Sequence, residues 1–259
     1  MGWIEVASML LKLTDRNRST NRGRPCKASD REFLEKIQFV LRTGIQWNRL
    51  SGDLHWSTYY KKFCKWSQMG IFTTSFKIVQ KILKKAKYLN QSSYRNLYID
   101  SSMIKNIKGS DGVGTNHYDR GRKGSKISIV VTQEGIPLGI TLSGSHIHDI
   151  RLVEDLVDKI TVKVIGSRLI GDKGYNSRRL KTRLANKGID LIYPFKRNQR
   201  EENTESERQL LRSRNIVENV FSWQQNNRHI RLRYDRYLIN YESFYYIGLM
   251  ALIDKKISY

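Results

Sequence analysis

Two aspartates follow apolar runs of the sequence, in positions where carboxylates could take part in metal-dependent chemistry. Asp100 ends the apolar run LYIDSS, and Asp172 ends the apolar run LIGDKG, so each is expected at the end of a β-strand. A carboxylate in that place either caps a turn or takes part in a reaction. If the two strands are adjacent and parallel, their carboxyl ends lie side by side, where open α/β sheets bind ligands. Facing carboxylates repel each other and favour a cation between them.

The ligand chemistry indicates which cation would fit. Oxygen ligands suit Mg²⁺ or Mn²⁺, and the two cysteines of the chain have no zinc-binding spacing. Two such ions about 3.5 to 4 Å apart can activate a nucleophile and stabilise a leaving oxygen in phosphodiester chemistry. A third carboxylate is needed, and Glu218 in RNIVENVF is the candidate, because its apolar neighbours should shield it partly from solvent.

Arg214 precedes Glu218 by four residues, so an expected helix presents both on one face. By itself this spacing is typical of an ordinary surface ion pair. The company of Asp100 and Asp172 in a strongly basic chain favours a functional role instead.

The elements that would position these carboxylates follow from the change of period after residue 96. Strands are expected at NLYIDSS, KISIVVTQ, PLGITLSG, SRLIGDK and DLIYP, and helices at DIRLVEDLVDKI, NSRRLKTRLANKG and residues 205 to 228. The second and third strands are separated by a short turn and should form a hairpin. This order predicts a mixed α/β sheet with helices covering its faces.

The first part of the chain has the pattern of helices. One helix should begin after Ser29, whose partner Glu32 completes a capping box, and end at Gly44. Others are expected from Ser57 to Gly70 and over residues 74 to 87. A small, basic, all-helical domain of this size fits a DNA-binding helix-turn-helix unit or a plain helical bundle.

The domain boundaries follow from these patterns. Residues 17 to 29 are polar and basic and are broken by Gly23 and Pro25, which is typical of an arm or linker. We therefore expect a poorly ordered basic arm over residues 1 to 28, a helical DNA-binding domain over 29 to 92 and a catalytic domain over 93 to 259.

The charge of the chain points to a polyanionic partner. Its 259 residues include 47 Lys and Arg against 24 Asp and Glu, a formal net charge of +23. Nucleic acid fits this excess best, because neutralised phosphates release condensed counterions. A merely soluble basic protein fits less well, since the excess exceeds the modest net charge that solubility needs. A membrane surface also fits less well, since the charges are not gathered on one amphipathic helix. No apolar run reaches the membrane-spanning length of about 18 residues, so we expect a cytoplasmic protein.

A glycine-punctuated basic loop, NHYDRGRKGSK, precedes the second strand. Phosphate binding is favoured there over a merely solvated loop, and the candidate ligands are Tyr118, Arg120, Arg122, Lys123 and Lys126. For His146 and His148 in GSHIHD, fixing a turn is favoured over contact with metal or DNA.

Several motif blocks resemble those of one family. YIDSS, GRKGSKISIVVTQEGIPLGITLSGSHIHD, LIGDKGYNS and RNIVENVFSW with RLRYDR follow the order found in bacterial DDE transposases of the insertion sequence 5 family. GRPCKASDREFLEKIQFVLRTGIQWNRL and HWSTYYKKFCKW resemble the amino-terminal helical region of those proteins. The resemblance covers residues 22 to 253, and the first twenty or so residues match the family's usual start poorly.

The resemblance implies a ribonuclease H-like catalytic fold in which Asp100, Asp172 and Glu218 hold two Mg²⁺ (or Mn²⁺) ions. The implied reaction is hydrolysis at the ends of an insertion sequence, followed by attack of the new 3′-hydroxyls on target DNA. Its implied partner is double-stranded DNA, as terminal inverted repeats and as target, bound by a homodimer without any membrane. The alternative is a catalytically inactive relic that occupies element ends; a structure-selective nuclease is a third reading.

Arg214 matches the arginine of the family motif and would contact a DNA phosphate or brace Glu218. The family's tyrosine seven residues before the glutamate is Leu211 here, and its lysine seven residues after it is Gln225. We expect other basic side chains to supply phosphate contacts near the carboxylates, namely Lys173, Arg228 and Arg231.

Overall fold

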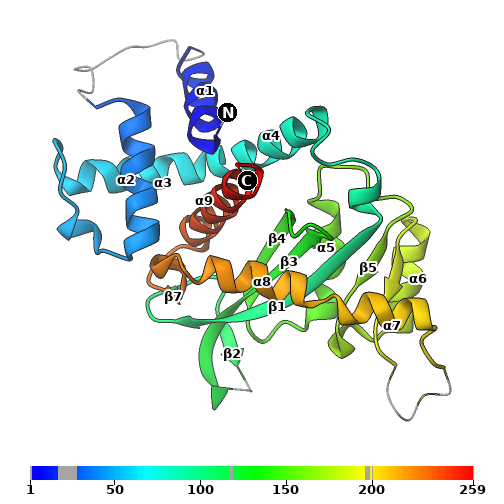
Figure 1. Cartoon of the computed structure of the whole chain (residues 1–259). Coiled ribbons are helices and arrows are strands. Elements are labelled where there is room, and N and C mark those ends of the chain that lie inside the picture. The colour runs from blue at the N-terminus through cyan, green and yellow to red at the C-terminus, as the bar shows by residue number, and fades with distance from the viewer. Residues whose placement is uncertain (1, 17–27, 117–118, 196–198, 200, 259) are drawn as a thin grey trace. The chain divides into compact units, whose positions relative to one another are not determined.

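The computed structural model describes residues 2–16, 28–116, 119–195, 199 and 201–258 (Figure 1). Two compact units make up the chain. The helical unit contains Met1–Val79, Ile107–Asp111 and Gln224–Tyr259, and the sheet unit contains Gln80–Asn106 and Gly112–Trp223. This division differs from the one expected from the sequence, because the last part of the chain belongs with the amino-terminal helices and not with the sheet.

The helical unit is built from α-helices joined by short turns. They are α1 (Trp3–Arg16), α2 (Asp30–Thr43), α3 (Trp56–Gln68), the first part of α4 (Ile71–Lys85) and α9 (Leu238–Ile257). The short strand β7 (Leu232–Arg233) also belongs to this unit.

The capping residues of α2 are those that the sequence indicated. The Oγ atom of Ser29 accepts a hydrogen bond from the Glu32 N–H at 3.2 Å, which satisfies one of the unpaired donors at the helix start. At the other end Gly44 takes a left-handed conformation with φ 67° and donates to Val40. Helix α3 begins two residues earlier than expected, because His55 and not Ser57 is its N-cap.

The core of the helical unit forms around α9. The rings of Phe63 and Phe244 lie 4.4 Å apart between centroids, and the Trp3 N–H donates to Asp254 Oδ2 at 2.9 Å. Residues 3 to 16 thus form a helix with buried Trp3 and Leu11, where we expected part of a poorly ordered arm. The rest of that arm, residues 17 to 27, lies outside the described residues. Within the described ranges, no helix is both long enough and apolar enough to cross a membrane.

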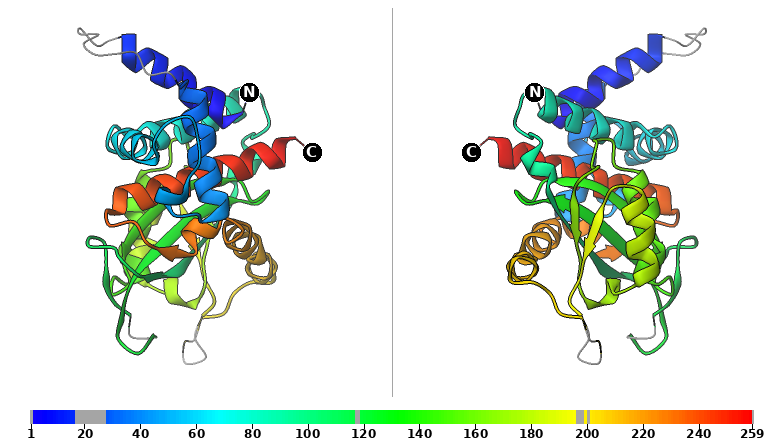
Figure 2. Two further views of the ribbon diagram at one scale, coloured as in Figure 1. Left: turned by 90° about the vertical axis from the view of Figure 1, so that its left-hand side faces the viewer. Right: turned by 90° about the vertical axis from the view of Figure 1, so that its right-hand side faces the viewer.

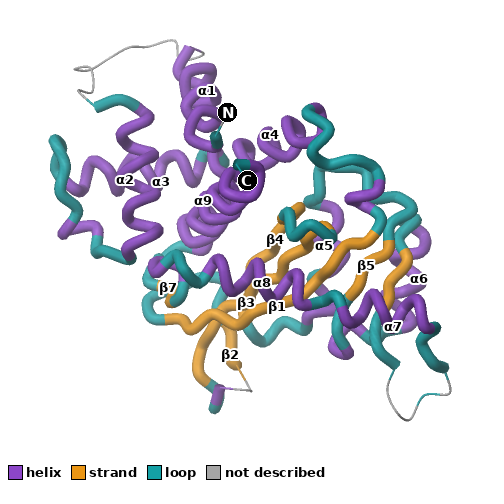
Figure 3. Tube along the Cα trace, in the orientation of Figure 1, coloured by secondary structure: helices purple, strands orange, loops and turns teal. Residues whose placement is uncertain are grey.

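The sheet unit contains a mixed β-sheet (Figure 3). Its strands are β1 (Asn96–Asn106), β2 (Gly114–Asn116), β3 (Arg122–Thr132), β4 (Pro137–Gly144), β5 (Arg168–Ile170) and β6 (Asp190–Ile192). β1, β2 and β4 all pair antiparallel with β3, and β4 forms the expected hairpin with it. β5 pairs parallel with both β1 and β6. The two strands that lead to Asp100 and Asp172 are thus adjacent and parallel, as the sequence condition required. The expectation that Asp100 ends its strand is wrong, because β1 continues to Asn106 and Asp100 itself pairs with Ile129 of β3.

Helices cover both faces of this sheet. α5 (Val153–Asp158) and α6 (Arg178–Asn186) lie on one face, and α7 (Glu205–Arg212) and α8 (Asn215–Gln224) lie on the other (Figure 2). The long helix expected over residues 205 to 228 is wrong, because the Ser213 N–H bonds the nearer carbonyl of Leu210 and closes α7 there. Residues 149 to 160 form a single turn and the short α5, and His148, not Asp149, caps that turn.

Candidate functional site

Asp100 lies on the face of β1 that α7 and α8 cover. Because side chains alternate along a strand, Tyr98 and Asp100 share one face, and Ser101 faces the other way. Tyr98 faces Ser213, and Arg214 Nη2 lies 3.8 Å from Asp100 Oδ2. Both partners come from the turn between α7 and α8. The break in the expected long helix is therefore what directs Arg214 toward Asp100.

The surroundings of Asp100 disfavour its charged form. Its side chain is 22% exposed. Burial raises the pKa of Asp100, and the charges of Asp172 and Glu218 raise it further, although the Ser101 N–H and the Arg214 guanidinium act in the opposite direction. Asp172 and Glu218 thus each lie close enough to Asp100 to act on it electrostatically.

Asp172 occupies the matching place on the neighbouring strand. The last paired residues of the parallel ladder are Tyr98 of β1 and Ile170 of β5, and each aspartate comes two residues later. Asp172 also caps the single turn Lys173–Tyr175, since its Oδ1 accepts from the Gly174 N–H at 2.7 Å. Both interpretations of this residue therefore hold: it caps a turn and it lies beside a second carboxylate.

Glu218 lies in the first turn of α8. Its side chain is exposed, so the expectation that apolar neighbours shield it was wrong. Among the described residues the ion pair of Arg214 is made with Asp100 and not with Glu218, and the Arg214 Nε atom is buried without a hydrogen-bond partner. The ordinary i, i+4 surface pair is therefore not what the structure contains.

A hydrogen-bonded group that the sequence did not single out lies behind Asp100. Ser101 Oγ is 2.7 Å from Ser128 Oγ on β3 and 3.1 Å from the Tyr175 hydroxyl. Tyr175 is buried, and burial raises the pKa of its hydroxyl. Its ring lies close to Gly171, where a Cβ would meet Tyr175 Cδ2 at 2.6 Å. The sequence signal was the alternation along β1, which places Ser101 opposite Asp100.

The expected phosphate ligands fall into different environments. Arg120, Arg122 and Lys123 are exposed where β2 and β3 meet, as a phosphate-binding loop requires. Lys126 is different: only 4% of it is exposed, and its Nζ donates to Ile147 O at 2.8 Å and pairs with Asp149 at 2.9 Å. Its assignment as a DNA ligand is corrected, because it holds a turn inside the protein. Tyr118 lies outside the described residues.

The remaining basic candidates divide between the two units. Lys173 is exposed beside Asp172 in the sheet unit. Arg228 and Arg231 are exposed in the helical unit, where Arg231 also donates to the Gln225 carbonyl.

Of the two histidines in GSHIHD, His148 fixes a turn. His148 Nδ1 accepts from the Ile150 N–H at 3.3 Å, as the turn-fixing interpretation predicts. A Cβ on Gly114 would meet His146 Nδ1 at 1.7 Å, so only glycine leaves room for the packing of His146 there.

The donor set suits a hard divalent cation. Carboxylate oxygens are the ligands that Mg²⁺ and Mn²⁺ prefer, and a cation would offset the mutual repulsion that raises the pKa of Asp100. Across the described ranges, no three His, Cys, Asp or Glu side chains already stand around one point as metal ligands would. Because Glu218 is exposed on the surface of α8, a change of its rotamer needs no repacking of the core.

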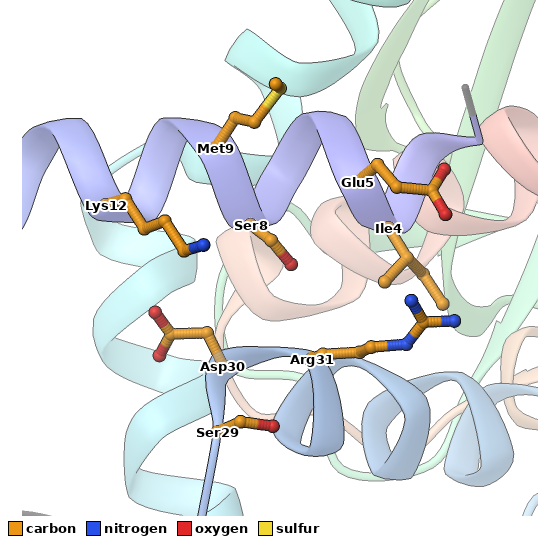
Figure 4. Close-up of a pocket in the computed structure, with 8 residues that line it drawn as sticks. All are labelled: Ile4, Glu5, Ser8, Met9, Lys12, Ser29, Asp30 and Arg31. Carbon is orange, nitrogen blue, oxygen red and sulfur yellow. The ribbon is translucent and has the colours of Figure 1, made fainter.

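A pocket of about 390 Å³ lies elsewhere, between α1 and α2 of the helical unit (Figure 4). It is lined by Ile4, Glu5, Ser8, Met9, Lys12, Ser29, Asp30 and Arg31. None of the three carboxylates belongs to that unit, so the pocket is separate from the candidate site.

Two family descriptions match the chain. Residues 3–76 match a family described as "Putative transposase of IS4/5 family", and residues 91–253 match the family "Transposase DDE domain". The first match begins at residue 3, so the beginning of the chain fits the family better than we expected.

A curated relative and a solved structure agree with these matches. The chain is 30% identical over 154 residues to the "Putative transposase for insertion sequence element IS402" of Burkholderia cepacia, over 56% of this chain and 68% of the relative. In fold it is similar to the piggyBac transposase, solved as a synaptic complex with hairpin DNA, with a TM-score of 0.54 and 10% identity over 98% of this chain and 70% of that one. The fold is thus the ribonuclease H-like one that the resemblance implied. Since the DDE domain match spans most of the chain, the protein belongs to the DDE transposase family, in its IS4/5 group.

Proposed function

We propose that this transposase cleaves DNA at the ends of an insertion sequence and joins the freed ends to target DNA, in a reaction that depends on divalent metal ions. The observation that carries the proposal is the mutual position of the carboxylates. Parallel pairing of β1 and β5 places Asp100 and Asp172 each two residues past the last parallel pair. Glu218 of α8 acts electrostatically on the Asp100 carboxyl group.

Asp100, Asp172 and Glu218 are the proposed ligands of two Mg²⁺ or Mn²⁺ ions. When bound, such ions activate the attacking oxygen and stabilise the leaving oxygen of a phosphodiester. Strand β1 fixes Asp100 and the capped turn after β5 fixes Asp172, while Glu218 would approach from a helix by a change of rotamer. Because none of these residues has to form a covalent bond to DNA, the site needs no serine or cysteine nucleophile.

Arg214 and the basic loop have separate proposed roles. Arg214 keeps a buried, unpaired Nε atom beside Asp100, and this donor suits a phosphate oxygen of the bound strand. Arg120, Arg122, Lys123 and Lys173 are exposed in the same unit and would hold the backbone of the duplex. The partner is double-stranded DNA, held by a homodimer so that two element ends can be processed together.

The test is cleavage and strand transfer on a duplex that carries the inverted repeats flanking the gene. Wild type should nick this DNA only when Mg²⁺ or Mn²⁺ is present, and Asp172→Asn should lose the activity while it keeps DNA binding. Asp190→Asn is the matched control, because Asp190 is an exposed aspartate of β6 in the same unit.

The same assay separates the alternatives. If wild type and Asp172→Asn bind the repeats equally and neither nicks them, the chain is an inactive protein that occupies element ends. If wild type cuts branched DNA without regard to the terminal sequence, it is a structure-selective nuclease. Either result would overturn the proposal.

A further inference from the structure

Helix α4 carries a row of lysines that the proposed cleavage site does not use. Between Asp53 and Asp100 the sequence contains no Asp or Glu, but it contains nine Lys and Arg residues. Five of the nine lie in α4 or just after it, and all five are exposed: Lys77, Lys81, Lys84, Lys85 and Lys87. A stretch of this length without a carboxylate leaves the helix without acidic partners from its own part of the chain.

Three of these lysines form one stripe along the helix. Lys77, Lys81 and Lys84, called the α4 lysine stripe below, are spaced by four and three residues and therefore share one face. The opposite face is apolar and buried through Phe76, Val79 and Leu83. The stripe consequently stands on a helix that is anchored by its other side.

No carboxylate in the described part of the chain pairs with the stripe. This distinguishes α4 from the other basic helix, α6, whose Lys181 and Arg183 pair with Asp190 and Glu154. Lysines four residues apart are separated by about 6 Å along a helix axis, which is less than the Debye length of about 8 Å at physiological salt. The stripe therefore repels itself unless an outside polyanion neutralises it.

The helix dipole accounts for only part of the pattern. Cations in the last turn of a helix interact favourably with its carbonyl end. This interaction is enough to explain why Lys84 and Lys85 occupy the last turn of α4. Lys77 and Lys81 stand too far from that end to benefit. The helix dipole thus does not explain Lys77 and Lys81.

We propose that the α4 lysine stripe is a docking surface for the phosphate backbone of double-stranded DNA, separate from the carboxylate site and independent of sequence. Regularly spaced ammonium groups suit a regularly charged backbone, and lysine binds phosphate as a point charge without reading base edges. The inference rests on the proposed function, in which DNA is the substrate. It adds a non-specific contact that holds the duplex while the carboxylates act elsewhere.

The test measures how DNA affinity depends on salt, with a duplex of arbitrary sequence, the full chain and EDTA present. Wild type is compared with the triple variant Lys77→Gln, Lys81→Gln, Lys84→Gln. Each phosphate contact contributes about 0.9 to the slope of log affinity against log salt, so the triple variant should lose about 2.7 from the magnitude of the slope. Lys→Arg substitutions at the same three positions should retain the wild-type slope, since they keep the charge.

The matched control is Lys159→Gln, Lys181→Gln, Lys187→Gln. It removes the same charge from one exposed and two half-buried lysines, which are paired with Asp155, Asp190 and Asp158. If both triple variants lower the slope equally, the effect is one of net charge and the inference is overturned. Thermal unfolding by circular dichroism verifies that each variant is folded.

Other outcomes are equally informative. If the stripe variant keeps the DNA slope but loses binding to phosphatidylglycerol vesicles, the surface binds lipid and the inference is overturned. If the stripe variant has the predicted smaller salt slope while wild type nicks no element ends, the docking proposal stands and the proposed catalysis fails. If the stripe variant keeps the wild-type salt slope while wild type nicks element ends, the docking proposal fails and the proposed catalysis stands.

Discussion

Neighbouring side chains decide what each carboxylate can do. Asp100 is partly buried, and burial together with Asp172 and Glu218 raises its pKa, although Arg214 lies 3.8 Å away. Without a cation this arrangement costs stability, because like charges are held near one another in a poorly solvated place. Functional sites commonly carry such a cost.

Asp100→Asn should therefore raise the free energy of unfolding at neutral pH in EDTA, by on the order of 1 kcal/mol. The folded-state pKa of Asp100 lies above its ordinary value of 3.8, so wild type gains stability as the pH falls through that pKa. The advantage of the variant should accordingly shrink on acidification. Urea unfolding at several pH values measures it, with Asp190→Asn as the control; an advantage that grows at low pH would contradict the explanation. Mn²⁺ should stabilise wild type and not Asp100→Asn.

Tyr175 offers a second test at a single residue. Tyr175→Phe keeps the buried ring but removes the hydroxyl that lies 3.1 Å from Ser101 Oγ, so it should cost about 1 kcal/mol of unfolding free energy. Tyr94→Phe is the comparison within the same unit. Tyr94 is also buried, but its hydroxyl has no hydrogen-bond partner among the described residues, so its removal should be neutral or stabilising. Equal losses in both variants, measured by urea unfolding, would show that the Ser101 bond contributes nothing.

At the scale of elements, the packing of β5 against the turn after it fixes Asp172. The ring of Tyr175 folds back over Gly171, and Ile99 of β1 lies on the same glycine. Gly171 is thus a close-packing position between two strands and the capped turn. Only glycine fits this position, because the packed interior has no room for a methyl group there.

Gly171→Ala should therefore destabilise the sheet unit by about 1 to 3 kcal/mol, the usual cost of overpacking. The new Cβ would lie 2.6 Å from Tyr175 Cδ2 and 3.2 Å from Ile99 Cγ2. Gly139→Ala on β4 is the matched control, since its Cβ would meet its nearest neighbours at an ordinary 3.4 Å. Urea unfolding of both variants checks the difference, and similar losses would mean that crowding at Gly171 is not the cause.

At the scale of the whole molecule, the chain passes between the two units several times, so each unit is assembled from distant segments. In the helical unit Arg233 joins two of them. Its side chain is fully buried, and it donates to Asp111 O at 2.6 Å, to Asp111 Oδ1 at 2.8 Å and to the Arg236 carbonyl at 3.3 Å. Asp111 Oδ1 also accepts from the Leu238 N–H at the start of α9.

Arg233→Met should lower the free energy of unfolding by about 2 kcal/mol, because it removes the buried guanidinium that donates to the Asp111 carboxylate and to two backbone carbonyls. Arg233→Lys should recover part of the loss, since an ammonium group restores the charge but not the fork of donors. The control is Arg212→Met, at an exposed arginine whose ion pair with Glu205 is long, where the change should stay below about 1 kcal/mol. Thermal unfolding compares the variants, and an equal effect at both positions would exclude a special role for Arg233.

Local sequence signals determined a substantial part of this protein. The parallel strands β1 and β5, the β3–β4 hairpin and the caps of α2 all follow from residue type and spacing within a few positions, although β1 continues beyond Asp100 to Asn106. Such features are set by backbone dihedrals and by hydrogen bonds between near neighbours, which a sequence pattern carries directly.

Tertiary structure alone decided the rest. Most residues of α9 are buried, but only the folded structure shows that the helix belongs with the amino-terminal helices. Lys126 belongs to a basic loop in the sequence, yet it is buried against Asp149, and the turn that ends α7 directs Arg214 to Asp100 and not to Glu218. The physical reason is the same in each case: a residue's type and local spacing fix its hydrogen-bonding capacity, its charge and its preferred face, whereas its partner is chosen by segments far away in the chain.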